Sequence, residues 1–171
     1  SEDRTKKAIL GGIARGDIWL NKIKHDNDNN RIRGNVCLEV YLPSRGTCLL
    51  QHVNLGACKI EDLQKAFATG MSSLCDLHGR TNIEASGEYL PSKTDRQVGL
   101  GVLGLANFLS NNNVTYADFA NALDRKTLER PSQTALHIVE QLELAIGGAA
   151  HIARHNNMAV SYTHLRAHET G

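Results

Sequence analysis

The sequence has little cysteine, proline or aromatic content, with four Cys, three Pro and 5% Phe, Trp and Tyr among 171 residues. Cys37, Cys48, Cys58 and Cys75 are ten or more positions apart, whereas the cysteines of a zinc-binding pair are usually separated by two to four residues. The spacing therefore predicts no metal site. Because 41% of the residues are hydrophobic, a core can form without cross-links, which favours reduced thiols and a cytoplasmic location over a disulfide scaffold.

An excess of one charge and a long hydrophobic run are also missing. The 19 Lys and Arg residues nearly balance the 18 Asp and Glu residues, and no basic stripe indicates nucleic-acid binding. The most apolar stretch, VGLGVLGLANFL at 98–109, is too short to span a bilayer and contains three glycines. The first residues, SEDRTKK, lack both a signal-peptide pattern and an initiating Met. We expect no membrane segment and no direct nucleic-acid partner, and we expect the chain to be a piece of a longer protein.

Helical and extended patterns alternate along the chain. Helices are expected over 2–14, 60–77, 103–110, 116–124 and 132–154, and strands over 17–23, 37–42, 47–55 and 96–102, with a polar loop at 25–34. Within the helix at 60–77, the apolar residues Leu63, Phe67, Leu74 and Leu77 are expected on one face. This alternation predicts an α/β fold, either layered or a barrel.

The stretch NVCLEVYLPSRGTC, residues 35–48, combines three functional groups in an alternating pattern. In an extended segment Asn35, Cys37 and Glu39 share one face, while the intervening residues form an apolar face. An amide, a thiol and a carboxylate together can position a substrate, supply a reactive sulfur and act as a general base. Strands also bury cysteines for packing, so the spacing alone leaves both interpretations open.

The pattern G-x-G-x-x-G occurs at Gly99–Gly104, before an expected helix. A dinucleotide fingerprint needs a long buried strand before it and an acidic residue at a strand end about 20 positions later. Here only two extended residues precede the glycines, and Asp118 and Asp124 lie in a polar helical segment. A nucleotide- or dinucleotide-binding module is therefore the weaker alternative, and we expect the glycines to allow close packing of strand and helix.

Two further sets of residues could hold a metal or react, but their surroundings favour structural roles. His151 and His155 are four positions apart on an expected helix, yet no glutamate follows the first, and the segment is polar. We therefore expect surface histidines. Cys58 and Cys75 have no acid or base nearby in the sequence, and we expect them to be packing residues.

Several motifs, in order, resemble the catalytic barrel of the large chain of ribonucleotide reductase. They are N-x-C-x-E at 35–39, a cysteine at 48, N-L-G at 54–56, RQVGLGVLGLANFL at 96–109 and, upstream, GDIWLNKIKHDN at 16–27. The resemblance covers about 16–125 and, more loosely, 1–159. Val36 departs from the proline or leucine of many relatives, at a position without a catalytic role. The resemblance implies an incomplete part of a ten-stranded α/β barrel, with exposed strand edges and poor stability in isolation.

The resemblance also implies a role for each residue of the stretch. The family reduces ribonucleotides to 2′-deoxyribonucleotides through a thiyl radical, which Cys37 would carry and use to abstract the ribose 3′-hydrogen. Glu39 would be the base for the 3′-hydroxyl, and Asn35 would hold substrate and carboxylate in register. Cys48 would be one half of the dithiol that reduces the 2′ position, with a partner cysteine upstream of this chain. Cys37 and Cys48 would then be thiols with separate roles.

Other components of the reaction are implied from outside the chain. The radical generator would be adenosylcobalamin, which the short gap between Cys37 and Cys48 favours, or a metal-containing small subunit. A thioredoxin- or glutaredoxin-like protein would supply the dithiol reductant, and the parent enzyme could be a homodimer. The fragment by itself is expected to be inactive, and which residues would bind a cofactor is unknown.

The last residues follow a pattern of their own. VSYTHLRAHET, residues 160–170, resembles one reading frame of a transposase adapter used in preparing DNA sequencing libraries. We therefore interpret 160–171 as a non-native tail and exclude it from reasoning about the fold, and we expect no ligand role for His164 or His168.

Overall fold

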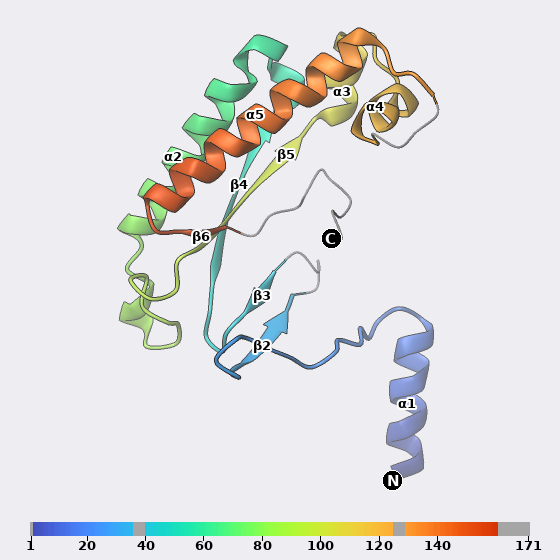
Figure 1. Ribbon diagram of the computed structural model, residues 1–171. Coiled ribbons are helices and arrows are strands. Elements are labelled where there is room, and N and C mark those ends of the chain that lie inside the picture. The colour runs from blue at the N-terminus through green and yellow to red at the C-terminus, as the bar shows by residue number, and fades with distance from the viewer. Residues whose placement is uncertain (1, 36–39, 125–128, 161–171) are drawn as a thin grey trace. The chain divides into compact units, whose positions relative to one another are not determined.

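The computed structural model describes residues 2–35, 40–124 and 129–160 (Figure 1). The chain divides into two compact units, residues 1–46 and residues 47–171. The described residues of the first unit form one helix and a small antiparallel sheet. The second holds a parallel sheet and the remaining helices.

The first unit begins with helix α1, Glu2–Ala14, where the sequence predicts it. Glu2 and Asp3 lie in its first turn, where negative charge interacts favourably with the helix dipole. The helix ends before Gly16, whose φ of 78° is the left-handed conformation that glycine adopts readily after a helix.

The antiparallel sheet of the first unit differs from the expected pattern. Its strands are β1 (Lys24–His25), β2 (Arg31–Gly34) and β3 (Tyr41–Leu42), in the order β1-β2-β3. The strand predicted over 17–23 is wrong, and the predicted loop at 25–34 is a hairpin. Asp26 Oδ1 accepts the backbone N–H groups of Asp28 and Asn30, at 3.0 and 2.8 Å, so these polar residues form a tight turn between paired strands.

The second unit contains the two strands that the sequence predicts most clearly. β4 (Cys48–Asn54) pairs in parallel with β5 (Gln97–Leu103), and β5 pairs in parallel with the short β6 (Ala159–Val160). The register places Cys48 opposite Gln97 and Asn54 opposite Leu103. In the described residues the order β4-β5-β6 is an open sheet with two edges, so the mixed α/β fold is confirmed and no closed barrel forms.

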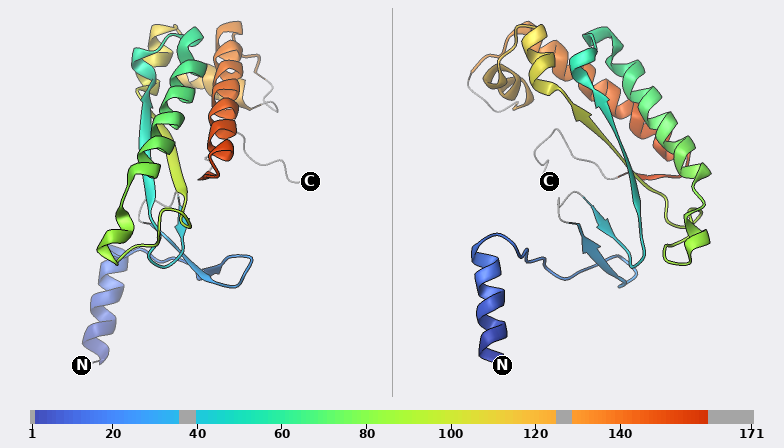
Figure 2. Two further views of the ribbon diagram at one scale, coloured as in Figure 1. Left: turned by 90° about the vertical axis from the view of Figure 1, so that its left-hand side faces the viewer. Right: turned by 180° about the vertical axis from the view of Figure 1, so that it is seen from behind.

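In the described part of the second unit, four helices accompany this sheet. They are α2 (Leu63–Arg80), α3 (Leu105–Asn111), α4 (Tyr116–Leu123) and α5 (Gln133–His155), with 3-10 turns at Leu55–Ala57, Ile60–Asp62 and Ile83–Ser86. All four predicted helices of this unit are confirmed. Side-chain oxygens of Thr115 and Ser132 accept N–H groups in the first turns of α4 and α5, as N-caps do. Figures 1 and 2 show α2 and α5 side by side on the same side of β4 and β5.

The core lies between the sheet and these two helices. Val53 and Val98 point toward α2 and are buried, and Leu100 packs beside them. α2 contributes a buried stripe, which consists of Leu63, Phe67, Gly70, Met71, Leu74, Cys75 and His78. Leu77, expected in this stripe, is 51% exposed. At 100° per residue it lies about 80° round the helix from the middle of the buried stripe.

Candidate functional site

The stretch predicted to carry the chemistry is described only in part. Cys37 and Glu39 lie outside the described residues, between Asn35 and Val40. Asn35 is half-buried at the end of β2, and its Oδ1 accepts the backbone N–H of Val40 at 3.4 Å. This bond brings together the two ends of the segment that holds Cys37 and Glu39. It also orients the amide, because Oδ1 is the atom turned toward Val40.

Cys48 is the first residue of β4 and belongs to the second unit, whereas Asn35 belongs to the first. Its thiol is reduced and half-buried, and the Sγ lies 3.8 Å from the carbonyl oxygen of Leu49. Residues alternate along a strand, so Cys48 shares a face with Leu50 and His52. That face points away from α2, because Val53, on the other face, contacts Gly70 of this helix. The structure therefore places Cys48 on the face of the sheet that α2 leaves uncovered.

The structure shows a buried carboxylate near Cys48, that of Asp95, which the sequence did not indicate. Asp95 is 5% exposed, and its Oδ2 accepts the backbone N–H of Thr47 at 2.6 Å. Its Oδ1 accepts Nε2 of Gln97 at 3.3 Å, and its backbone oxygen lies 3.0 Å from Nε2 of the buried His78. The carbonyl partner assigns the ring proton of His78 to Nε2. Asp95 thus joins the residues that precede and face Cys48. Only the tertiary pairing of β4 with β5 brings them together, so no local pattern could indicate it.

The other two described cysteines have surroundings that suppress reactivity. Burial raises the pKa of the Cys75 thiol; the nearby Arg96 guanidinium opposes this rise in part, and the Asp76 carboxylate adds a smaller rise. Burial also raises the pKa of the Cys58 thiol, with a smaller contribution from Asp62. Both side chains pack in or against the core, which confirms the packing role predicted for them. A raised pKa lowers the fraction of reactive thiolate.

The glycine pattern is largely part of a strand. Gly99 and Gly101 lie within β5, and a Cβ at these positions would come within 2.6 Å of Leu50 and 2.8 Å of the His52 ring. The expected packing against a helix is therefore wrong, because these glycines make room for side chains of β4 on the uncovered face. Gly104 alone stands at a turn, with φ of 71°, close to Asn54. A dinucleotide fingerprint requires its glycines in the turn after the strand, which is not the arrangement here.

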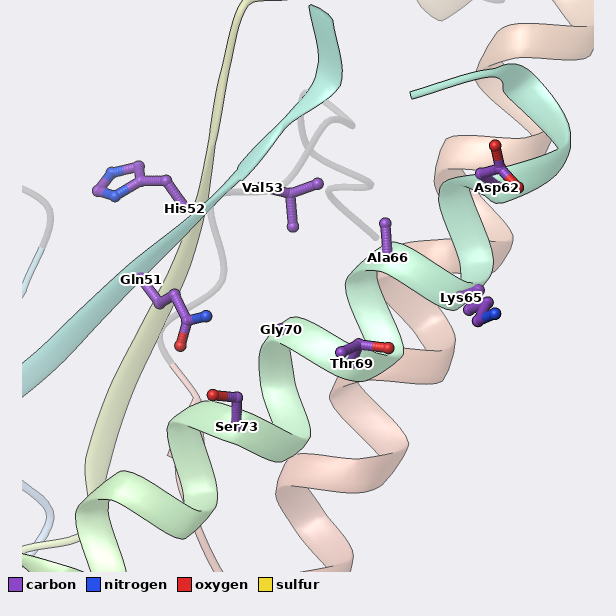
Figure 3. Close-up of a pocket in the computed structure, with 9 residues that line it drawn as sticks. All are labelled: Gln51, His52, Val53, Asp62, Lys65, Ala66, Thr69, Gly70 and Ser73. Carbon is purple, nitrogen blue, oxygen red and sulfur yellow. The ribbon is translucent and has the colours of Figure 1, made fainter. Parts of the chain in front are cut away.

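A cavity of about 430 Å³ lies at the open edge of β4, against α2 (Figure 3). Figure 3 shows Gln51 and Val53 on the α2 side of the strand and His52 projecting from the other side. Lys65 and Thr69 line the helical wall. Of the predicted catalytic residues, Asn35 and Cys48 lie in the described part of the chain, and neither lines this cavity.

His151 and His155 are exposed on α5, as predicted. Within the described ranges, no group of three or more His, Cys, Asp or Glu side chains is placed to hold a metal ion. A membrane-crossing helix is also missing from the described residues, since none is both long and apolar enough.

Comparisons with known proteins agree with the order of motifs. The family model described as "Ribonucleotide reductase, barrel domain" matches residues 19–151. The chain is also 26% identical over 136 residues to the ribonucleoside-diphosphate reductase subunit alpha of Buchnera aphidicola subsp. Acyrthosiphon pisum, and 25% identical over 136 residues to that of the Schizaphis graminum subspecies. Each match covers 67% of this chain and 18% of the relative, so the chain spans about a fifth of the curated relatives that it matches.

The matched range contains Asn35, Cys48 and the glycine-bearing strand β5. It takes in most of both compact units, from the segment before β1 to the last turns of α5. With this extent of agreement, the chain belongs to the ribonucleotide reductase barrel-domain family.

Proposed function

We propose that this chain is part of the catalytic subunit of a ribonucleotide reductase, the enzyme that makes 2′-deoxyribonucleotides for DNA synthesis. The observation that carries the proposal is the position of Cys48. Its reduced, half-buried thiol stands at the start of β4, on the face of the sheet that α2 leaves uncovered. Within a barrel-domain sequence, an N-x-C-x-E motif precedes this cysteine and an N-L-G turn follows it.

The overall reaction replaces the 2′-hydroxyl of a ribonucleotide with hydrogen. Two thiols supply two hydrogen atoms, so one ribonucleotide and one dithiol give one 2′-deoxyribonucleotide, one disulfide and one water. We assign one of these thiols to Cys48 and the other to a cysteine outside this chain. A thioredoxin- or glutaredoxin-like protein would then reduce the disulfide for the next turnover.

Cys37 is the proposed radical residue, and Glu39 is the proposed base. As a thiyl radical, Cys37 abstracts the 3′-hydrogen and becomes a thiol, and it regains the radical when it returns a hydrogen atom at the end of turnover. Glu39 accepts the 3′-hydroxyl proton. Oδ1 of Asn35 accepts the backbone N–H of Val40. A hydrogen bond from Asn35 to the substrate would therefore use Nδ2 as the donor.

The radical itself would be generated outside this chain. Adenosylcobalamin or a metal-containing small subunit would supply the oxidising equivalent that converts Cys37 to its radical, and the short spacing to Cys48 favours adenosylcobalamin. The chain covers 18% of its relatives, and we propose that it is inactive without the remaining strands of the barrel.

Cysteine substitutions in the full-length reductase that contains this segment test the proposal. Cys37→Ser should abolish both turnover and exchange of the substrate 3′-hydrogen. Cys48→Ser should leave exchange intact and block multiple turnover with a dithiol reductant. Cys58→Ala is the matched control, because that thiol packs against the core and should be dispensable. Normal turnover by the Cys48→Ser enzyme would refute the assignment of the reducing thiol.

A further inference from the structure

We propose that Asp95 is a positioning residue that fixes the thiol of Cys48, an inference that rests on the reducing role proposed above for this cysteine. Asp95 lies in the loop that precedes β5. Its two carboxylate oxygens accept hydrogen bonds from two residues that neighbour Cys48. One accepts the N–H of Thr47, the residue that precedes Cys48. The other accepts the amide of Gln97, the residue directly opposite Cys48 in the parallel register.

Because Asp95 is buried, its carboxylate depends on these hydrogen bonds. A buried carboxylate is strongly unfavourable unless hydrogen bonds compensate for its lost hydration. Asp95 is 5% exposed, and both of its oxygens accept N–H groups within the second unit. The 2.6 Å distance to Thr47 N is that of a short, charge-assisted bond. A shift of the start of β4 would break this bond and leave a buried charge poorly compensated, so the backbone beside Cys48 is held in place.

Asp95 is itself held from a third direction. The backbone oxygen of Asp95 accepts the Nε2 proton of His78, which is 4% exposed in the last turns of α2. The backbone of Asp95 therefore cannot follow a movement of β4 without breaking its contact with the helix. Hydrogen bonds of Asp95 thus connect the start of β4, through the loop before β5, to helix α2.

Gln97 completes the arrangement on the side of the sheet that carries the sulfur. It stands opposite Cys48, and directly paired residues of neighbouring strands project from the same face. Because Nε2 of Gln97 donates a hydrogen bond to Oδ1 of Asp95, the orientation of the Gln97 amide is set. Oε1 is then the atom that this side chain can offer as an acceptor on the face of Cys48. A thiol that must meet both a ribose carbon and a second sulfur needs such a fixed position.

The first experiment measures Cys48 itself in the 171-residue chain. Hydrogen exchange of the Thr47 amide and alkylation of Cys48 by iodoacetamide are compared between wild type, Asp95→Ala and the control Asp76→Asn. The control removes the same charge from an exposed position of α2. Asp95→Ala should speed Thr47 exchange about tenfold or more, because a charge-assisted bond is lost. It should speed alkylation of Cys48 several-fold and leave that of Cys58 unchanged.

Asp95→Asn provides a second variant that keeps the shape of the side chain. Its amide oxygen can still accept from Thr47, without the charge, while Gln97 must turn its own amide round to accept from the new NH₂ group. We expect Thr47 exchange and Cys48 alkylation between the wild-type and Asp95→Ala values. Wild-type rates for both groups in both Asp95 variants would overturn the proposal. If the alanine variant unfolds, the asparagine variant decides between these outcomes.

The second experiment separates positioning from general stability in the full-length reductase. Asp95→Ala should lower dithiol-dependent kcat about tenfold while leaving KM for the ribonucleotide and the rate of 3′-hydrogen exchange unchanged, the pattern of a displaced reducing thiol. A purely structural role would lower exchange and turnover together. That result, or unchanged kcat, would overturn the inference.

The two proposals fail in different ways. If Cys48→Ser proves harmless in the full-length enzyme, the proposed role of the cysteine is wrong. If Cys48→Ser blocks turnover but Asp95→Ala behaves as wild type, only the inference about Asp95 is wrong.

Discussion

Alanine at Gly104 should destabilise the second unit through two separate effects. The residue has φ of 71°, a conformation that costs a residue with a side chain about 1–2 kcal/mol. A Cβ there would also lie 2.8 Å from Oδ1 of Asn54 and 2.9 Å from the backbone nitrogen of Gly56. Backbone atoms cannot move aside cheaply, and such overpacking costs about 1–3 kcal/mol. We expect Gly104→Ala to lower the free energy of unfolding by about 2–5 kcal/mol in total.

Two other glycines separate these effects. Gly87 also has φ of 71°, but a Cβ there would meet no atom within 4 Å, so Gly87→Ala should cost about 1–2 kcal/mol from conformation alone. Gly147 lies in the exposed part of α5 with open space around its Cα, so Gly147→Ala should stabilise the chain by about 0.5–1 kcal/mol.

Urea denaturation of the 171-residue chain, followed by circular dichroism, measures all three variants. With a slope of about 2 kcal/mol per molar urea, a difference of 1 kcal/mol moves the midpoint by about 0.5 M. The midpoint of Gly104→Ala should therefore lie at least that far below the midpoint of Gly87→Ala. Equal midpoints for these two variants would refute the argument that the turn after β5 is closely packed against the N-L-G turn.

Three further predictions concern other contacts. Arg96→Met should lower the free energy of unfolding by about 2 kcal/mol in urea, because the guanidinium donates to backbone oxygens at the C-terminal end of α5; an unchanged midpoint would contradict this. Hydrogen bonds from Ser132 hold the pKa of Asp118 below its usual value of 3.8. The carboxylate therefore stabilises the fold above that pH, and the contribution is lost as the pH falls through the lowered pKa. Ser132→Ala should flatten this acid dependence in unfolding curves recorded across the same pH range, and an unaltered slope would argue against the linkage. Cys75, whose pKa burial raises, should be alkylated more slowly than Cys48 in the native chain, as mass spectrometry of labelled peptides would show; faster labelling of Cys75 would contradict its placement in the core.

Some residues of the candidate site can be identified from the sequence, and others only from the structure. Asn35 and Cys48 could be chosen from the sequence because each belongs to a short motif with fixed spacing. Asp95 could not be chosen, because its partner Thr47 is 48 positions away and its role depends on the parallel pairing of β4 with β5. The register also decides which side chains the glycines of β5 meet, and this is why the expected contact with a helix was wrong.

Local periodicity was sufficient for the long elements of the second unit. The stripe of apolar residues along α2 and α5 and the hydrophobic runs of β4 and β5 indicate each element correctly, because burial of one face dominates their stability. In the first unit, β3 lies within the strand predicted over 37–42, whereas β1 and β2 were missed. A two-residue strand such as β1 has no periodicity to detect, and its position depends on the turn that Asp26 closes.

The sequence by itself determined the α/β class, the principal helices and strands of the second unit and, through the order of its motifs, the family. Only the tertiary structure decided which face of the sheet carries Cys48, that Gly99 and Gly101 make room for side chains of β4, and that Asp95 joins the two strands beside the cysteine. The physical reason is the range of the forces involved. Periodic burial is a property of neighbouring residues, whereas strand register and a shared buried carboxylate exist only after distant segments have paired.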